Sequence, residues 1–456
     1  MSTDYDVIVL GAGPAGEACA GALADGGLRV AVVERELVGG ECSFWACIPS
    51  KTLLRPGEVV AAARDVPGAA EAITGPIDAR AVFAWRDYMV SGLDDGGQLK
   101  WLDEKGIDLI RGAGRLQGHG VVEVGGRRHT ARHVVIATGS SPVIPPVEGL
   151  RELEGVWTNR EATQMQKVPR RMLVLGGGPV GVEMAQVVAR LGGEVALVEG
   201  MEHVLPREPR RLGEGLAHAL RRDGVELHFG MHAKTARRDG EDFVVTFGDG
   251  TELRGDRLLV ATGRRPRVED IGLESVGVTA ERHGIPVDGR MSAGDGIWAI
   301  GDAAGTWPLT YVGKYQGRIA AANILGDDRV ASYDAVPRVV FTSPQAASVG
   351  EGEGRFTATT PLSDVPKTAT YTRAWEDNPG FMTLVSDGER LTGAYALGPE
   401  AGEWLQQATL AIRAKVPLAI MVDTIQPFPA FSEVFVAALA ELDASIRASA
   451  RARAAA

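Results

Sequence analysis

Two cysteines lie five residues apart in the segment 39–51, which reads GGECSFWACIPSK. A continuous helix would separate Cys42 and Cys47 by about 7.5 Å along its axis, more than the ~4.4–6.8 Å between Cα atoms that a disulfide spans. Bridging them therefore requires a locally distorted turn, and strained disulfides are easily reduced. The pair predicts a redox-active disulfide; the alternative interpretation is two unrelated buried thiols. The third cysteine, Cys19, falls in a predicted helix and is interpreted as a small core residue.

A nucleotide-binding pattern precedes the cysteines. An apolar strand at residues 5–10 runs into GAGPAG at residues 11–16, an alanine-rich helix follows, and a second strand at 30–33 ends at Glu34. The glycines permit a tight turn and a close approach of backbone N–H groups to a pyrophosphate, which the helix N-terminus favours electrostatically. Glu34 would then accept the ribose hydroxyls. The order of strand, turn, helix, strand and acid predicts a dinucleotide site, with Gly11, Gly13 and Gly16 at the turn.

The same pattern occurs a second time. A strand at residues 172–175 leads into GGGPVG at 176–181, and a strand at 194–198 ends at Glu199; each acid follows the first glycine of its motif by 23 residues. Both patterns also close with a strand followed by Ala-Thr-Gly, at 134–139 and 258–263. The sequence therefore predicts a duplicated α/β architecture with two nucleotide sites. The further site residues assigned on this basis are Thr138, Gly139, Gly176, Gly178, Gly181 and Gly263.

The length and composition of the chain limit the number of domains and the classes of function that it can have. A chain of 456 residues is too long for one ordinary core and suggests two to four domains. The net charge of −11 argues against a general nucleic-acid surface. We find no signal-peptide pattern, no apolar run of about eighteen residues and no metal site, and three cysteines do not make the disulfide framework of a secreted protein. We expect a cytoplasmic protein that contacts neither membrane nor nucleic acid.

Taken together, these motifs resemble the flavoprotein disulfide reductases, the family of dihydrolipoyl dehydrogenase, glutathione reductase and mercuric reductase. The resemblance spans nearly the whole chain. It includes IWAIGD at 297–302, similar to the family's segment that returns to the FAD domain, and VPRVVFTSP at 336–344, similar to the start of its interface domain. It implies FAD in the first unit, with Gly301 and Asp302 beside the ribityl chain, a nicotinamide nucleotide in the second unit, and a homodimer.

The fold class that follows is α/β, with two Rossmann-like dinucleotide-binding domains and a C-terminal α+β dimerisation domain. The expected boundaries are an FAD-binding domain at 1–150 and 271–335, an NAD-binding domain at 151–270, and an interface domain at 336–456.

The resemblance also implies roles for individual residues. Cys47 is the thiol against the flavin, and Cys42 is the outer thiol that exchanges with substrate. Lys51 and Glu183 match an ion pair that the family places beside the reactive edge of the flavin; the alternative is two solvated charges on helices. The cofactor supplies the hydride chemistry, while the protein supplies placement and charge.

Glu199 predicts the choice of nucleotide. A carboxylate at this position accepts the ribose hydroxyls of NAD and repels the additional phosphate of NADP, so we expect NADH to be preferred. Arg207, Arg210 and Arg211 follow shortly afterwards. They leave open a phosphate-binding role, with surface solvation as the alternative.

The chain departs from the family near its C-terminus. Thiol-exchanging members carry a histidine there, with a glutamate five residues later, and the pair moves protons for the leaving thiol. The matching positions hold Phe428 and Glu433. A phenyl ring is neither acid nor base, and loss of a positioned proton donor costs on the order of 100- to 10,000-fold in rate. Phe44 and Trp45 between the cysteines, with Phe428 and Phe431 supplied by the partner copy of a dimer, suggest an apolar, aromatic-lined mouth. The alternative is that these rings fill the core of the interface.

The leading hypothesis is an FAD-dependent oxidoreductase that passes electrons between NAD(H), flavin and the Cys42–Cys47 pair, to or from a disulfide, a dithiol or a related small molecule. Two alternatives remain open. One is an NADH-dependent reductase of a quinone or metal ion. The other is a flavoprotein in which the cysteine pair senses redox state without catalysis.

Overall fold

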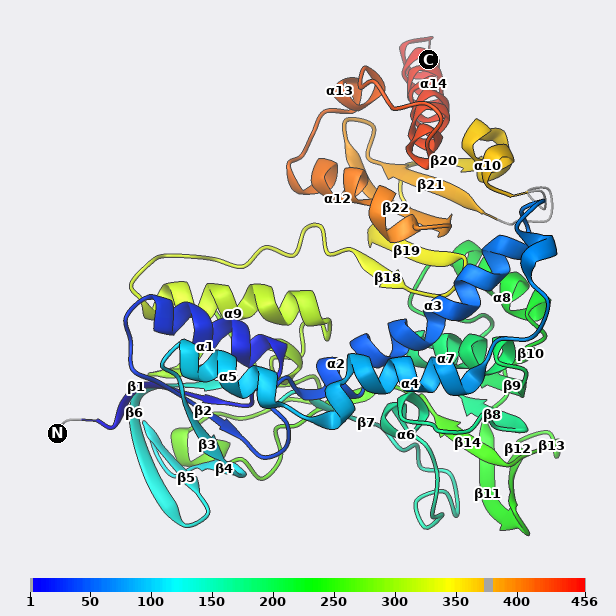
Figure 1. Cartoon of the computed structure of the whole chain (residues 1–456). Coiled ribbons are helices and arrows are strands. Elements are labelled where there is room, and N and C mark those ends of the chain that lie inside the picture. Colours follow the sequence, from blue (N-terminus) through cyan, green and yellow to red (C-terminus); the bar gives the residue numbers. More distant parts are fainter. Residues whose placement is uncertain (1–2, 373–379, 456) are drawn as a thin grey trace. The chain divides into compact units, whose positions relative to one another are not determined.

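The computed structural model describes residues 3–372 and 380–455. The chain divides into two units, each assembled from separate stretches of sequence (Figure 1). Unit 1 comprises Met1–Ser50, Ala84–Val143 and Gly263–Ser332, and unit 2 comprises Lys51–Phe83, Ile144–Thr262 and Tyr333–Ala456. Within the described ranges, none of the helices combines the length and apolar character needed to cross a membrane.

Unit 1 is built around a sheet in which the strands run in the order β3-β2-β1-β6-β17-β16. The first five of these strands are parallel, and β16 is antiparallel to β17. Their bounds are β1 (Tyr5–Leu10), β2 (Val30–Glu34), β3 (Asp108–Arg111), β6 (Arg127–Ile136), β16 (Ser292–Gly294) and β17 (Ile297–Ala299). An antiparallel extension adds β4 (Gly114–Leu116) and β5 (Val121–Val124).

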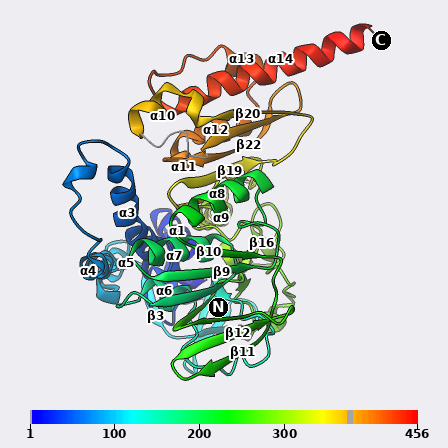
Figure 2. The ribbon, with the colours of Figure 1, turned by 90° about the vertical axis from the view of Figure 1, so that its right-hand side faces the viewer.

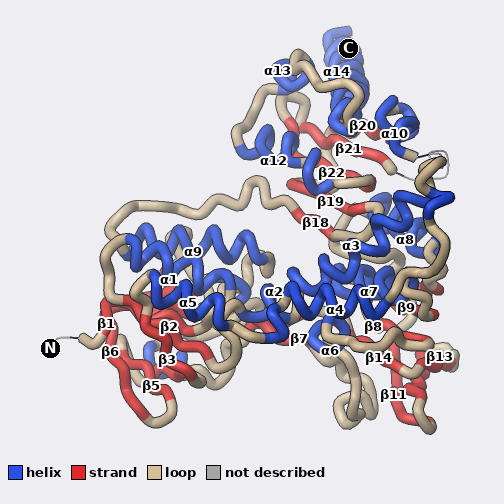
Figure 3. The backbone as a smooth tube through the Cα atoms, in the orientation of Figure 1, coloured by secondary structure: helices blue, strands red, loops and turns tan. Residues whose placement is uncertain are grey.

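The strands of unit 1 are apolar on both faces, as expected for buried parallel strands. Val7 and Val9 face a core formed with α1 (Pro14–Asp25) and α9 (Thr310–Ile324), which lie side by side on the sheet (Figure 3). Ile8 and Leu10 contribute to the opposite core. The remaining elements are α2 (Gly40–Phe44), α5 (Gly96–Glu104), η2 (Ser91–Leu93), η3 (Leu273–Val276), η4 (Gly301–Ala303), and the ribbon of β7 (Ser140–Pro142) and β15 (Arg264–Pro266).

Unit 2 repeats this design in a parallel sheet of order β10-β9-β8-β14. Leu175 pairs with Val198 and Val260, as Leu10 pairs with Val33 and Ile136 in unit 1. The strands are β8 (Arg171–Leu175), β9 (Glu194–Glu199), β10 (Glu226–Phe229) and β14 (Arg257–Val260), with an antiparallel extension of β11 (Ala233–Asp239), β12 (Asp242–Phe247) and β13 (Glu252–Gly255). The helices are α6 (Asn159–Thr163), α7 (Pro179–Arg190) and α8 (Arg210–Arg222). The predicted duplication is confirmed.

The C-terminal part of unit 2 is an antiparallel sheet of order β18-β19-β22-β21-β20. Its strands are β18 (Arg338–Val340), β19 (Gln345–Gly350), β20 (Phe356–Pro361), β21 (Phe381–Ser386) and β22 (Leu391–Gly398). Its helices are α10 (Pro366–Tyr371), α11 (Ala401–Trp404), α12 (Gln406–Arg413), α13 (Leu418–Val422) and α14 (Val434–Ala455), with η5 (Leu362–Asp364) and η6 (Phe431–Glu433). Figure 2 shows α14 along this sheet and extending past it. The predicted α/β class with a C-terminal α+β portion is confirmed.

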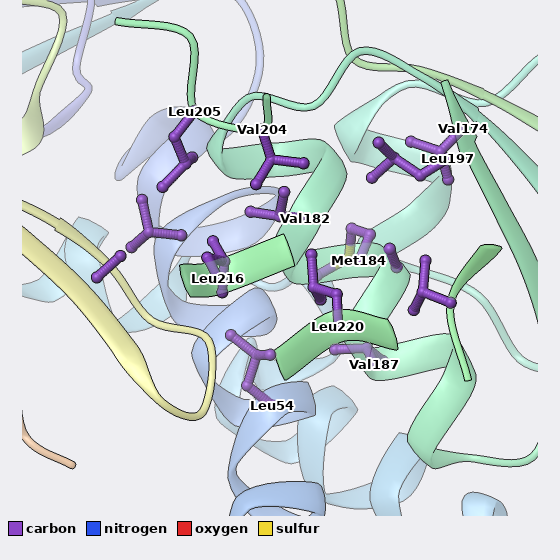
Figure 4. Packing of buried hydrophobic residues seen from close by; sticks show 14 of the residues in the cluster. Leu54, Val174, Val182, Met184, Val187, Leu197, Val204, Leu205, Leu216 and Leu220 are labelled. Carbon is purple, nitrogen blue, oxygen red and sulfur yellow. The ribbon is translucent and has the colours of Figure 1, made fainter. Parts of the chain in front are cut away.

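Helices α3 (Cys47–Arg64) and α4 (Ala79–Met89) each begin in one unit and end in the other. In unit 2, η1 (Ala70–Ala72) lies between them in sequence. Leu54 of α3 packs among Val187 of α7 and Leu216 and Leu220 of α8 (Figure 4). The later turns of α3 are therefore anchored in the largest core of unit 2, while its first turn carries Cys47.

Candidate functional site

The two thiols of the cysteine pair come from two different helices. Cys42 lies in the short α2, which ends at Phe44, and Cys47 is the first residue of α3. Trp45 leaves the helical conformation with φ −135°, so the expected distorted turn is present. In the described residues, the sulfurs of Cys19, Cys42 and Cys47 are not joined in a disulfide, and the reversible disulfide stays a prediction. The N-terminus of the 18-residue α3 favours a thiolate at Cys47.

A threonine and a lysine of α9 act on this pair. The hydroxyl of Thr310 lies 3.3 Å from Sγ of Cys47. The pKa of the Cys42 thiol is raised, first by its hydrogen bond with Cys47, then by burial and the charge of Cys47. Thr310 and the positive charge of Lys314 oppose this rise. Within the pair, Cys47 therefore disfavours ionisation of Cys42, through both a hydrogen bond and its charge.

The residue before Cys42 is held by two arginines. Glu41 lies 3.1 Å from Arg267 and 3.5 Å from Arg264, and all three side chains are about one-quarter exposed or less. Arg264 donates to the hydroxyl of Ser140 at 2.8 Å, and that hydroxyl donates to Oδ2 of Asp302 at 2.5 Å. A continuous polar chain therefore connects α2 to the aspartate that we expect beside the ribityl group.

In unit 2, Lys51 and Glu183 form the ion pair that the resemblance implied. Nζ of Lys51 lies 2.8 Å and 3.0 Å from the two carboxylate oxygens of Glu183, whose side chain is 5% exposed. Phe341 completes the cluster: its N–H donates to Glu183 at 2.9 Å, and its ring lies 4.8 Å from Nζ of Lys51. The lysine is therefore held by both an anion and an aromatic face.

The first glycine motif has the shape of a pyrophosphate cradle. Gly11 adopts φ +107°, which favours glycine, and a Cβ atom on Gly13 would meet no atom within 4 Å. Gly16 leaves no room for a Cβ beside the carbonyl of Gly11. At the end of β2, Glu34 accepts hydrogen bonds from the N–H groups of Ala12 and Glu36, both at 2.8 Å. The open turn and the fixed carboxylate fit a dinucleotide with its pyrophosphate at the N-terminus of α1.

The second motif reproduces these contacts. Gly176 has φ +109°, Gly178 is open in the way Gly13 is, and Gly181 packs on the carbonyl of Gly176. Glu199, 9% exposed, accepts from the N–H groups of Gly177 at 2.7 Å and Met201 at 2.9 Å. This site also fits a dinucleotide.

The arginines after the second motif have other partners. Arg210 pairs with Glu202 at 2.8 Å and Glu214 at 2.7 Å, and the guanidinium of Arg211 lies 4.8 Å from the centre of the Phe381 ring. Arg207 is exposed. These contacts support surface solvation over a phosphate-binding role.

The other predicted site residues of unit 1 gather at the ends of its strands. The Thr138 hydroxyl, after β6, donates to the carbonyl of Arg267 at 2.6 Å. Gly139 and Gly263 adopt φ +73° and +124° at the ends of the β7–β15 ribbon. Gly301, at φ +64°, opens η4 ahead of Asp302, and its N–H donates to the buried Gln316 at 2.7 Å.

The four rings of the expected aromatic mouth lie in two units, and each pair is described within its own unit. In unit 1, the ring centres of Phe44 and Trp45 lie 5.7 Å apart. Phe44 is 2% exposed and Phe431 is 8% exposed; Phe431 packs edge-on against Tyr371, with ring centres 5.1 Å apart. Phe431 belongs to the apolar core of the C-terminal part of unit 2, which favours the alternative that this ring fills a core. The aromatic mouth itself stays a prediction. Phe428 is 73% exposed. Glu433 accepts a long hydrogen bond from the N–H of Ala430 at 3.4 Å.

Comparisons with known proteins agree with this geometry. The family model described as pyridine nucleotide-disulphide oxidoreductase matches residues 5–317, and the model of its dimerisation domain matches residues 336–439. The chain belongs to this family. It is an FAD- and pyridine nucleotide-dependent oxidoreductase by membership, and its C-terminal part is a dimerisation domain.

Several relatives cover nearly all of the chain. A dihydrolipoyl dehydrogenase of Thermus scotoductus is 36% identical over 94% of this chain and 95% of its own length. A mercuric reductase of Shigella flexneri is 34% identical over 92% of this chain and 78% of its own length. Among solved structures, a Cu(II) complex of the HOCl-induced flavoprotein disulfide reductase RclA from Escherichia coli aligns with a TM-score of 0.85 and 26% identity, covering 96% of this chain and 99% of that one.

Sequence reasoning missed several residues of the site. Thr310 and Lys314 carry no local motif, and Phe341 lay unremarked within the segment at 336–344. The partners of Thr310, Phe341 and Arg267 lie more than 150 residues away in sequence. For Arg264 and Arg267, their position after the second Ala-Thr-Gly was the available signal.

Proposed function

We propose that the protein transfers a hydride from NADH to FAD and passes two electrons through the Cys42–Cys47 dithiol to a small disulfide. The observation that carries this proposal is the thiol pair, with Cys47 at the N-terminus of α3 beside Thr310 and Cys42 on the separate α2. FAD supplies the hydride chemistry when bound. Cys47 would provide the thiolate beside the bound flavin, and Cys42 would exchange with the substrate.

Each remaining residue has a role in this scheme. The first glycine motif with Glu34 and Asp302 would hold FAD, and the second motif with Glu199 would hold NADH. Lys51, fixed by Glu183 and Phe341, supplies a positive charge one helical turn after Cys47. NADH is preferred because Glu199 presents a buried carboxylate at the end of β9.

A homodimer is part of the proposal. The dimerisation domain exposes apolar side chains around Phe428: Ile420 is 57% exposed, Val422 42%, and Ile425 95%. A second copy of the chain would cover them. Sedimentation should therefore give twice the 48.1 kDa chain mass, and Ile425→Asp should shift the equilibrium toward monomer; a wild type that sediments only as a monomer contradicts the dimer.

A metal ion is the second candidate acceptor. The mercuric reductases among the relatives act on mercury by name, and two neighbouring thiolates suit a soft cation. On this alternative the dithiol binds the ion, which receives the electrons in place of a disulfide.

Anaerobic reoxidation distinguishes these acceptors. The FAD-loaded protein is reduced with NADH and mixed with disulfides, quinones and Hg(II) or Cu(II), and the flavin absorbance is followed. We expect a disulfide to reoxidise the wild type, and Cys42→Ser to lose this reaction while its flavin is still reduced by NADH. Cys19→Ala, which removes a buried thiol of α1, serves as the matched control. Equal reoxidation of wild type and Cys42→Ser by the disulfide would refute the role of the dithiol.

A further inference from the structure

Helix α9 directs its N-terminal end toward the thiol pair. Thr310 is the first residue of α9, and its hydroxyl lies 3.3 Å from Sγ of Cys47; Figure 1 shows this end of α9 on the side of α2. Residues four apart share a helix face, about 6 Å apart along the axis. Lys314, an exposed residue, therefore follows Thr310 on the face that is turned toward the thiols.

The position of Lys314 is fixed by close packing between α9 and α1. A Cβ atom on Gly313 would lie 3.1 Å from Cβ of Ala15, and one on Gly317 would lie 2.7 Å from the carbonyl oxygen of Ala15. At Gly313 the two helices are therefore separated by no more than the methyl group of Ala15, and at Gly317 α9 packs on the backbone of α1. Lys314 follows Gly313 directly, so its backbone is held against the first turn of α1, where Glu17 lies.

The positive charge of Lys314 acts on two ionisable groups. Its charge opposes the rise in the pKa of Cys42 and also the rise in the pKa of Glu17. Burial raises the pKa of Glu17 to about 7, and the nearby charge of Glu34 contributes to the increase. The ammonium charge of Lys314 therefore lowers the pKa of both the Cys42 thiol and the Glu17 carboxyl group, and the latter titrates near neutral pH.

We propose that the ammonium group of Lys314 promotes thiol exchange by stabilising the thiolate of Cys42, in a protein whose histidine position is occupied by Phe428. Lys314 keeps its proton and acts through Cys42. Ionised Glu17 weakens this effect by neutralising part of the charge.

This thiol exchange rests on the proposed function. Cys42 releases its proton to water, and its thiolate attacks the substrate disulfide. The substrate S–S bond breaks, a mixed disulfide forms on Cys42, and the first leaving thiolate takes a proton from water. The thiolate of Cys47 then attacks Sγ of Cys42, which releases the second substrate thiolate and leaves the Cys42–Cys47 disulfide. Two electrons pass to the substrate.

Alkylation of Cys42 tests the proposal without any disulfide substrate. The FAD-loaded, full-length protein is reduced with a phosphine, treated with iodoacetamide between pH 5.5 and 9.5, and the modification of Cys42 is measured by mass spectrometry. Alkylation follows the thiolate fraction, and loss of one nearby positive charge typically moves a thiol pKa by about half a unit to one unit. Lys314→Met should therefore slow the reaction roughly 3- to 10-fold at pH 7 and move its midpoint to higher pH.

Companion variants separate charge from structure. Lys314→Arg should restore the rate, and Glu17→Gln should increase it above pH 7, an increase that disappears when Lys314→Met is added. Arg318→Met removes the next exposed charge of α9 and should leave the rate unchanged. A wild-type rate and midpoint in Lys314→Met, or an equal slowing in Arg318→Met, overturns the proposal. Because alkylation requires neither NADH nor a disulfide, failure of the proposed function would show instead in the reoxidation experiment.

Discussion

The N–H of Gly177 donates a hydrogen bond to Oε2 of Glu199 at 2.7 Å, and Oε1 of the same carboxylate accepts from Met201 at 2.9 Å. Glu34 makes the equivalent pair of bonds with Ala12 and Glu36 in unit 1. Each glycine turn is thus tied to the acid at the end of the neighbouring strand. The carboxylate of Glu199 is thereby fixed in position beside the second nucleotide cradle.

This arrangement predicts the nucleotide preference. An additional phosphate on the ribose would approach a fixed, buried carboxylate, and unpaired like charges in contact cost several kcal/mol. The wild type should favour NADH over NADPH by at least about 10-fold in kcat/KM, and Glu199→Ala should reduce this ratio. Glu202→Ala, which removes an exposed carboxylate paired with Arg210, should leave the ratio unchanged. A wild type that favours NADPH contradicts the role given to Glu199.

The two cysteines should differ in their spectra. On the proposed function Cys47 is the thiol beside the flavin, and only this thiol would give a long-wavelength thiolate-to-flavin absorption band. Cys42→Ser should therefore retain the band on reduction, and Cys47→Ser should lose it. Thiol titration of the unfolded protein should count two more thiols after reduction than before. An equal number of thiols before and after reduction would contradict the prediction of a reversible disulfide.

Glu41 should stabilise unit 1 more than an exposed acid does. Glu41→Gln removes the negative charge that pairs with Arg264 and Arg267, and the expected loss is about 1–2 kcal/mol after allowance for their partial exposure. FAD retention on gel filtration should also fall, since Arg264 connects to Asp302 through Ser140. Glu274→Gln, which breaks an exposed pair with Arg115, should cost less than about 1 kcal/mol. Identical melting and FAD retention in the two variants would show that the polar chain has no such role.

The features that could be predicted from the sequence are those whose residues lie close together along the chain. The strands before the glycine motifs and the acids after them lie within one βαβ stretch, so strand order, turn and acid were readable together. Thr310 and Cys47 meet over a separation of 263 residues, and Glu41 and Arg267 over 226. Such contacts depend on how α9 and the β7–β15 ribbon return to unit 1. The burial of Phe431 agrees with the alternative given for it, since Val434, Phe435, Ala438 and Leu439 follow it at helical spacing and share its core.

Glu17 predicts a pH dependence of stability. Its pKa is raised to about 7 in the folded protein because burial penalises the charge, whereas an unfolded glutamate ionises near 4.3. The folded state therefore retains a proton that the unfolded state releases, and stability from this group declines as pH rises from about 4.3 through 7. Glu17→Gln cannot ionise, so its Tm relative to wild type should increase between pH 5 and pH 8. The exposed Glu274→Gln should show no such increase, and a constant difference for Glu17→Gln would contradict the raised pKa.

Phe428 occupies the position at which thiol-exchanging members of the family carry a proton-transferring histidine. Reduction by NADH should proceed normally, because the residues expected around both nucleotides and the thiol pair are in place. Turnover with lipoamide or glutathione disulfide should be slow, since a phenyl ring cannot protonate the leaving thiolate.

Phe428→His introduces an imidazole five residues before Glu433, and Phe428→Leu provides an apolar control. Glu433 bonds only weakly to the N–H of Ala430, at 3.4 Å, so little free energy opposes its reorientation toward the new ring. We expect a gain of a few-fold for Phe428→His and none for Phe428→Leu, because the imidazole must also be oriented on a backbone that holds an exposed phenyl ring. Turnover of either disulfide by the wild type at about 10 per second or more, a typical enzyme rate, would mean that another acid already serves the leaving thiol.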